Sequence, residues 1–282
     1  MKNINIYVLL ALGCLVLYSL VSDPTKFFEN KSFKNKNFSL NQKQVEIFYE
    51  HYGDNPEVLQ AMRSLSSNNF GEAFLIFKSL FEEFEEGGDL PPLMTPFIGY
   101  FYQEGIGVEL DYQEAAKWYK IGAAEGDMLA SKLLGLLYLY GQGVSKDNEK
   151  AHELLLDAYN AGIKSAAEHL AFLYYRGIGV TRDFEQGFIF LKDSGEQGIS
   201  YMQNLLGNVY CYGLGTDRSH RKATEWFKKA VSSGDEYAPE NLAMVDMECK
   251  IKSESKAKYF FDLNMIAADK GNSVGMLNVG KA

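Results

Sequence analysis

Cysteine and proline are both scarce in this sequence of 282 residues, which has 3 cysteines and 6 prolines. Small secreted domains that are held together by disulfide frameworks use more cysteines than this. Cys14 lies in an apolar N-terminal segment, whereas Cys211 and Cys249 lie far along the chain. We predict buried free thiols for this second pair, although an oxidising compartment would permit a disulfide between them.

Patterns that indicate catalytic or metal chemistry are also lacking. The four histidines (His51, His152, His169 and His220) do not have the spacing of metal ligands. The segment "GIGV" at residues 105 to 108 resembles part of a phosphate-binding loop, but it has no third glycine and follows a predicted helix instead of a strand. We therefore predict no metal, no cofactor and no enzymatic activity.

Most of the chain has no excess of positive charge, and the net charge of the whole chain is −9. Residues 1–45 contain 6 lysines and 2 acidic residues, so the remainder has 22 basic and 35 acidic residues, or a net charge of −13. Nucleic-acid binding requires a basic surface. We expect no nucleic-acid partner and a solvated acidic surface that keeps the protein soluble.

The N-terminus has the pattern of a targeting segment. Lys2 precedes an apolar run over residues 4–21, whose length of 18 residues lies between that of a signal-peptide core and that of a membrane span. We predict a signal peptide or membrane anchor over 1–22, a polar linker over 23–45, and export to the periplasm or cell envelope of a bacterium. Cleavage, membrane attachment and a lipoprotein site at Cys14 stay open. The lysines that follow the run argue against export, because positively charged residues next to a membrane segment tend to stay on the cytoplasmic side.

Glycine pairs recur with a fixed step of 36 residues. A fixed period of this size is typical of a solenoid. Four units of this kind extend over residues 93–234, and in each we expect the glycine pair to form a structural turn between two helices. The eight turn glycines are Gly105, Gly107, Gly141, Gly143, Gly177, Gly179, Gly213 and Gly215.

The residue pattern of each unit predicts two helices. The segment at residues 128–140 represents the first helix. The second helix begins after a residue that can cap it, namely Asp111, Asp147, Asp183 or Ser219. Glu114 and Gln186 follow three residues later, where they would complete a capping box. Small or apolar residues then follow helical spacing, as in Ala115, Trp118 and Tyr119, and the column of Gly126 ends the helix.

This unit resembles the repeat of the Sel-one-like repeat family, a relative of the tetratricopeptide repeats; the motif "LGLLYLYGQGVSKDNEKA" at residues 134–151 is very similar to the family pattern. The resemblance implies an all-α fold, a right-handed α/α superhelical solenoid of helix-turn-helix repeats. It also implies a scaffold or adaptor that binds other proteins. A cysteine-rich branch of the family is credited with binding or hydrolysing β-lactams, but this chain lacks its paired cysteines, and other members serve polysaccharide export.

The flanking segments continue the pattern in degenerate form. Residues 46–92 are interpreted as a degenerate tetratricopeptide-like helix pair. Residues 235–282 are interpreted as a degenerate fifth repeat followed by a half-repeat cap. Residues 273–282 are expected to fold back over that repeat, and the alternative is that another chain completes them to give a dimer or an assembly.

The binding surface is expected on the first helix of each unit, which lines the concave face in related solenoids. Some equivalent positions of the repeats, which we call columns, are not required for packing. They supply the candidates for contact with a protein or peptide partner: Tyr100, Lys132, Leu136, Tyr140, Glu168, Phe172, Tyr175, Arg176, Asn208 and Tyr212. We predict an exported, non-enzymatic interaction scaffold. The alternative is an envelope glycan-related factor or a β-lactam-interacting enzyme of the same family.

Overall fold

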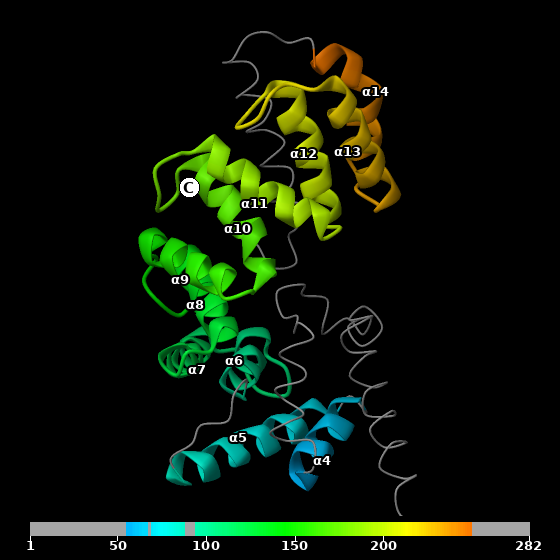
Figure 1. Ribbon diagram of the computed structural model, residues 1–282. Coiled ribbons are helices and arrows are strands. Elements are labelled where there is room, and N and C mark those ends of the chain that lie inside the picture. Colours follow the sequence, from blue (N-terminus) through cyan, green and yellow to red (C-terminus); the bar gives the residue numbers. More distant parts are fainter. Residues whose placement is uncertain (1–54, 67–68, 88–93, 250–282) are drawn as a thin grey trace, which may run out of the picture. The chain divides into compact units, whose positions relative to one another are not determined.

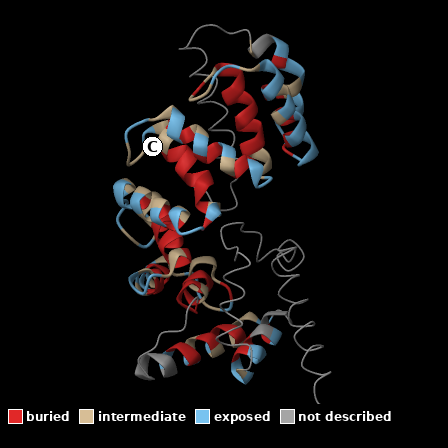
Figure 2. Cartoon of the chain, viewed as in Figure 1, coloured by how far each residue is buried: buried red, intermediate tan, exposed pale blue. Residues whose placement is uncertain are grey.

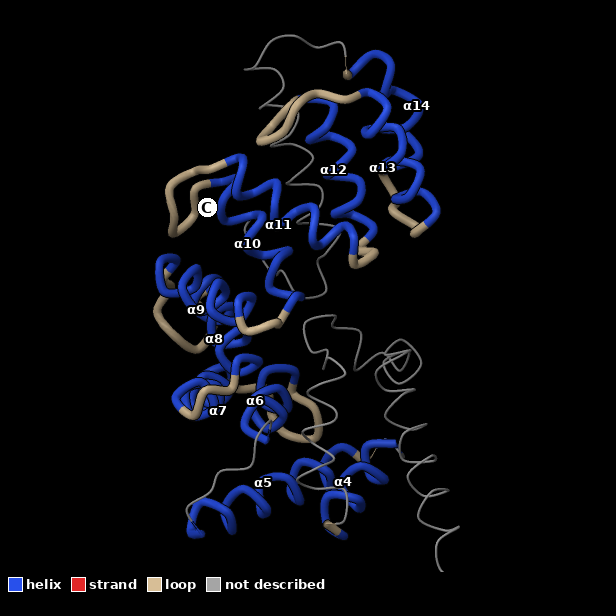
Figure 3. Tube along the Cα trace, viewed as in Figure 1, coloured by secondary structure: helices blue, strands red, loops and turns tan. Residues whose placement is uncertain are grey.

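The computed structural model describes residues 55–66, 69–87 and 94–249. These ranges contain eleven α-helices and one short 3-10 helix, and they contain no strand (Figures 1 and 3). The predicted targeting segment and linker, His51, and the end of the fifth repeat with its cap lie outside the described residues. The chain divides into two compact units, with the boundary between Lys146 and Asp147.

The first unit contains five helices. They are α4 (Pro56–Ser66), α5 (Phe70–Gly87), α6 (Met94–Glu104), α7 (Tyr112–Ala124) and α8 (Met128–Tyr140). Each helix packs against the next one along the chain, as expected for tandem helix pairs joined by short turns. The bounds of α8 are those that the sequence pattern predicts.

The second unit contains the remaining helices. They are α9 (Asn148–Asn160), the 3-10 helix η1 (Lys164–Ala166), α10 (Ala167–Arg176), α11 (Phe184–Glu196), α12 (Ser200–Tyr212), α13 (His220–Ser232) and α14 (Ala238–Glu248). The pairs α10–α11 and α12–α13 are full repeats, and α14 packs against α13 and α12. That α14 begins a degenerate fifth repeat stays a prediction. The predicted all-α class with tandem helix-turn-helix repeats is confirmed.

The glycine pair of each repeat lies between its two helices, and all eight of these glycines have left-handed backbone with φ between 66° and 79°. Gly141 ends α8 by adopting this conformation. Gly143 meets a second constraint, because a Cβ atom there would lie 2.0 Å from the backbone oxygen of Tyr112 at the start of α7. The second glycine therefore lets one repeat approach the backbone of the repeat before it.

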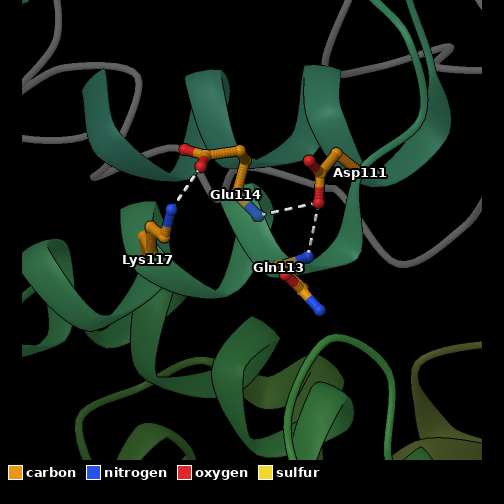
Figure 4. Close-up of polar contacts among 4 residues, drawn as sticks. All are labelled: Asp111, Gln113, Glu114 and Lys117. Carbon is orange, nitrogen blue, oxygen red and sulfur yellow. Dashed lines mark hydrogen bonds and ion pairs between the residues drawn. The ribbon is translucent and has the colours of Figure 1, made fainter.

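The second helix of each repeat begins at the predicted cap. In α7, the carboxylate of Asp111 accepts hydrogen bonds from the backbone N–H groups of Gln113 and Glu114, at 2.8 and 3.1 Å (Figure 4). The N–H of Asp111 donates to the carbonyl of Tyr102 at 2.9 Å. The predicted capping box is wrong here, because that donor is already used and the Glu114 side chain pairs with Lys117 instead.

The predicted capping box at Gln186 is also wrong, for the same reason. The N–H of Asp183 donates to the carbonyl of Tyr174 at 3.0 Å, as that of Asp111 does to Tyr102. The side chain of Asp183 still caps α11 by accepting from two backbone N–H groups. A carbonyl at the end of the first helix thus satisfies the donor that a capping box would have used.

Small residues on the first helix receive large side chains from the second. In the first unit a Cβ atom at Gly99 would lie 2.4 Å from the ring of Tyr119, and in the second unit a Cβ atom at Gly207 would lie 2.3 Å from the ring of Phe227. Both aromatic rings are fully buried. These close contacts hold the two helices of a repeat together.

Burial differs between the two helices of a repeat (Figure 2). In α8 every residue from Leu129 to Leu137 is buried, and in α12 every residue from Met202 to Tyr212 is buried. In α13, by contrast, the buried residues are confined to Ala223, Phe227 and Ala230. The first helices therefore form the core, while the second helices present one side to solvent.

Cys211 and Cys249 form a disulfide, with their Cα atoms 4.4 Å apart. The prediction of two free thiols is therefore corrected. Cys211 lies near the end of α12, and Cys249 directly follows α14, which packs against α12. The disulfide joins the end of α12 to the residue that follows α14.

Candidate protein-binding face

The predicted partner-binding residues all lie on the first helices of the repeats, α6, α8, α10 and α12. We call these residues the inner-face set. Only Tyr140 and Arg176 are partly exposed. The other members are buried: Tyr100, Lys132, Leu136, Glu168, Phe172, Tyr175, Asn208 and Tyr212. Partner binding by the set stays a prediction, and the structure places most of its members in the core.

In the first unit, Tyr100 and Lys132 illustrate this burial. Burial raises the pKa of the Tyr100 hydroxyl well above its usual range, and the carboxylate of Glu104 adds to this effect. The Lys132 side chain is fully buried on α8. Leu136 lies one turn further along α8 and is also buried, whereas Tyr140 at the end of the helix is partly exposed.

In the second unit, Glu168 links two consecutive first helices. Its carboxylate accepts a hydrogen bond of 2.6 Å from the hydroxyl of Tyr201 on α12. The Nε2 atom of His169 lies 3.2 Å from the same carboxylate. Glu168 therefore joins α10 to α12 through a partly buried polar contact.

Tyr175 packs within the second unit. Its hydroxyl donates to the carbonyl of Leu214 at 3.2 Å, and a Cβ atom at Gly187 would lie 2.8 Å from its ring. Burial raises the pKa of the Tyr175 hydroxyl, and the neighbouring Tyr210 contributes in the same direction. These contacts correct the prediction that packing does not require this column.

A second polar contact joins α12 to Asp235 and to α14. The Asn204 amide donates to the carboxylate of Asp235 at 2.9 Å, and its oxygen accepts from Asn241 at 2.9 Å. Asp235 also accepts from the backbone N–H groups of Tyr237 and Ala238 at the start of α14. Burial raises the pKa of Asp235.

The sequence contained a signal for Asp235 that the predictions did not use. Asp235 follows Asp127 by three steps of the repeat, and Asp127 caps α8 in the same way. An aspartate in this column is therefore an N-cap signal for the first helix. Tyr201 had no comparable signal, because its role depends on the neighbouring repeat.

The histidines of the described residues make pairwise contacts. The Nε2 atom of His152 lies 3.0 Å from the hydroxyl of Tyr174, and that of His220 lies 2.6 Å from the carboxylate of Asp246. Among the described residues, no three histidine, cysteine or acidic side chains gather as metal ligands would. None of the helices within the described ranges is long and apolar enough to span a membrane.

Comparison with known proteins agrees with the repeat geometry. The Sel1 repeat profile matches residues 97–127, 130–163, 164–199 and 200–235. The chain is a Sel1 repeat protein. These segments coincide with the four units that the glycine spacing delimits, which confirms the resemblance inferred from the sequence. No curated relative matches this Sel1 repeat protein in sequence.

Solved structures of other Sel1 repeat proteins are similar to it. A Sel1 repeat protein from Oxalobacter formigenes has a TM-score of 0.59 and 22% identity, over 76% of this chain and 88% of that chain. A protective antigen of uropathogenic Escherichia coli strains, which displays an SLR fold, has a TM-score of 0.60 and 20% identity. That match covers 89% of this chain and 57% of the antigen. At these identities the likeness concerns the fold alone.

Proposed function

We propose that this Sel1 repeat protein is an exported, non-enzymatic scaffold that binds a segment of another protein through its first helices. The observation that carries the proposal is the run of four tandem Sel1 repeats, because proteins built from this repeat generally serve as protein-interaction scaffolds. Each repeat contributes one first helix, so a partner segment can contact several repeats in succession.

The partly exposed members of the inner-face set support a protein partner. Tyr140 ends α8 and Arg176 ends α10, and each retains some exposure while the rest of its helix is largely buried. Tyrosine and arginine are enriched among residues that contribute most to binding energy at protein interfaces. These two side chains are therefore the first positions at which to test partner contact.

The binding test compares Tyr140→Ala and Arg176→Ala with Arg221→Ala, a control at an exposed position on the second helix α13. The full chain and each variant are used to capture proteins from an envelope extract, and the affinity for the captured protein is then measured. We expect the two inner-face variants to weaken binding by about tenfold each, while the control binds as the wild type does. Equal binding by all variants would contradict the proposed face.

Tyr212 is left out of this comparison, although it belongs to the inner-face set. Its side chain is buried, and its carbonyl accepts from Arg218 Nε at 3.0 Å. Truncating a buried aromatic side chain costs about 3–5 kcal/mol, so a loss of binding in such a variant could reflect unfolding alone.

Export is supported by two independent features. Lys2 precedes an apolar run over residues 4–21, which is the pattern of a targeting segment. The disulfide between Cys211 and Cys249 is of the kind that persists in oxidising compartments. A fusion of the chain to alkaline phosphatase, which requires its own disulfides to be active, tests the proposal in bacterial cells.

We expect the fusion to have phosphatase activity. We also expect Cys211 and Cys249 to react with a maleimide label only after reduction. Deleting residues 1–22 should abolish phosphatase activity, and this deletion is the matched control. An inactive full-length fusion, together with labelling of both cysteines without reductant, would refute export.

A further inference from the structure

The second helix α13 is basic, although most of the chain is acidic. It has four basic residues and one acidic residue, so its net charge is +3 with neutral histidine. The second helices of the two preceding repeats, α9 and α11, each have one basic and three acidic residues, so each has a net charge of −2. The outer sides of all three helices are exposed (Figure 2). The second unit therefore presents opposite charges on different helices.

The positive charge of α13 is largely uncompensated. Arg221 pairs with Glu225 on the same helix at 2.6 Å. Lys222, Lys228 and Lys229 are exposed, and they form no ion pair with any residue that the structure describes. These three lysines are therefore available to an acidic partner.

The negative charge of α9 is uncompensated in the same way. Glu149, Glu153 and Asp157 are exposed and follow one another at intervals of four residues, so they lie on one side of the helix. Within the described part of the chain, these three carboxylates form no ion pair. Like charges at this spacing destabilise a helix. A basic partner that approaches this side of α9 would relieve the repulsion.

Ile189 is an exposed apolar residue near the middle of α11, with 52% of its surface exposed. The same column contains Lys117, Glu153 and Glu225 in the other repeats, and all three are charged and exposed. An isoleucine at this position presents apolar surface where the other repeats present charge. Its burial on association would be favourable, because interfaces combine an apolar centre with a polar rim.

The helix α11 lies between the acidic helix α9 and the basic helix α13. The rings of Tyr159 on α9 and Phe190 on α11 have their centroids 5.0 Å apart. On the other side, Phe188 of α11 contacts the ring of Tyr210, and Lys222 of α13 lies over that same ring. Ile189 therefore lies on the helix that separates the two opposite charges.

We propose that the outer side of the second unit binds a second copy of this chain and forms a symmetric dimer. A two-fold axis beside Ile189 places this residue against its counterpart. The same axis places the basic helix α13 of each copy against the acidic helix α9 of the other, as an interface between identical surfaces requires. The contact uses second helices, so it is independent of the partner segment that we propose for the first helices.

Partners of other chemistry fit only part of this surface. An anionic lipid surface or an acidic peptide would attract the lysines of α13, but it would repel the carboxylates of α9 and leave Ile189 without a contact. A second copy presents the basic helix, the acidic helix and the isoleucine together. Charge complementarity therefore favours the chain itself as the occupant.

The test traps the dimer by oxidation at its axis. The full chain with Cys14→Ser and Ile189→Cys is treated with copper phenanthroline as oxidant, and the fraction of covalent dimer is measured on a non-reducing gel. Lys117→Cys in place of Ile189→Cys is the matched control, because it lies in the same column on α7. We expect about tenfold more dimer from Ile189→Cys than from the control at low salt, and less dimer at high salt, which screens charges.

A charge exchange then identifies the two helices that meet. One Ile189→Cys protein carries Lys228→Glu and Lys229→Glu, and a second, tagged protein carries Glu153→Lys and Asp157→Lys. Each alone should give no more dimer than the Lys117→Cys control, since α9 and α13 then have the same sign of charge. Mixing the two should restore dimer formation between tagged and untagged chains, because both contacts again join opposite charges.

Reversal of two other lysines controls for net charge. Lys117→Glu with Lys120→Glu changes the charge of the Ile189→Cys protein by the same amount on α7, and it should leave dimer formation unchanged. Equal trapping at Ile189→Cys and Lys117→Cys would overturn the proposal. So would a dimer that persists after both charge reversals, or a mixture that does not recover although each variant has the melting temperature of the wild type.

Discussion

Glycine 143 is held in place by both its conformation and its surroundings. Its φ of 68° is one that side-chain-bearing residues rarely adopt. Its backbone also lies against Tyr112 at the start of α7, where a Cβ atom would approach the carbonyl oxygen to 2.0 Å. Gly126 has a similar φ of 82°, but no heavy atom lies within 4 Å of a Cβ atom built there. A substitution at Gly126 therefore costs free energy through backbone conformation alone, whereas a substitution at Gly143 adds the cost of a close contact.

We predict that Gly126→Ala lowers the free energy of unfolding by about 1 kcal/mol and Gly143→Ala by about 2–4 kcal/mol. The first change adds only backbone strain, and the second adds a clash with the backbone of α7. Urea unfolding of the two variants and the wild type measures both values. Equal losses would mean that the repeats do not approach each other closely at Gly143.

Helix starts show how one element depends on its neighbour. The carboxylate of Asp111 caps α7, and the N–H of the same residue bonds to the Tyr102 carbonyl at the end of α6. The cap residue thus completes two helices at once. Glu114 contributes its backbone N–H to the cap, while its side chain pairs with Lys117 at the surface (Figure 4).

We predict that Asp111→Ala lowers the free energy of unfolding by about 1 kcal/mol, because it leaves two N–H groups of α7 without their acceptor. Glu114→Ala should cost less than about 0.5 kcal/mol, since it removes only an exposed ion pair. Thermal unfolding of both variants tests the difference. If Glu114→Ala lowered the free energy of unfolding as much as Asp111→Ala does, the result would favour the capping box that the structure contradicts.

At the scale of the whole molecule, stability at alkaline pH depends on buried tyrosines. Burial raises the pKa of Tyr119 in the first unit and of Tyr175 in the second above the usual value of 10.0. Both hydroxyls also donate hydrogen bonds, to Gln103 and to the carbonyl of Leu214. Above pH 10 the unfolded chain loses these protons while the folded chain keeps them.

We therefore predict that the stabilisation from each tyrosine is fully present below about pH 10 and is lost as the pH rises further, by about 1.4 kcal/mol per pH unit. Tyr175→Phe should make the alkaline loss shallower by that amount, although it removes one hydrogen bond at neutral pH. Unfolding by urea from about pH 8 to about pH 11 measures the slopes. Parallel curves for the wild type and the variant would contradict the prediction.

The sequence by itself determined the repeat, the helices and the turns. The 36-residue glycine spacing, the capping residues and the bounds of α8 follow from local backbone chemistry, which a single repeat contains in full. The spacing also revealed the resemblance to the family, because a repeated turn produces a regular pattern in the sequence, whatever the repeats pack against.

Tertiary structure decided which side chains the repeats bury and which polar atoms they satisfy. Tyr175 belongs to the core because Gly187 and Leu214 surround it, and Glu168 is buried because Tyr201 of the next repeat bonds to it. The pairing of Cys211 with Cys249 depends in the same way on the packing of α12 against α14. Each of these contacts joins one helix to another, and the periodicity of a single helix contains no information about the residue that a neighbouring helix will present to it.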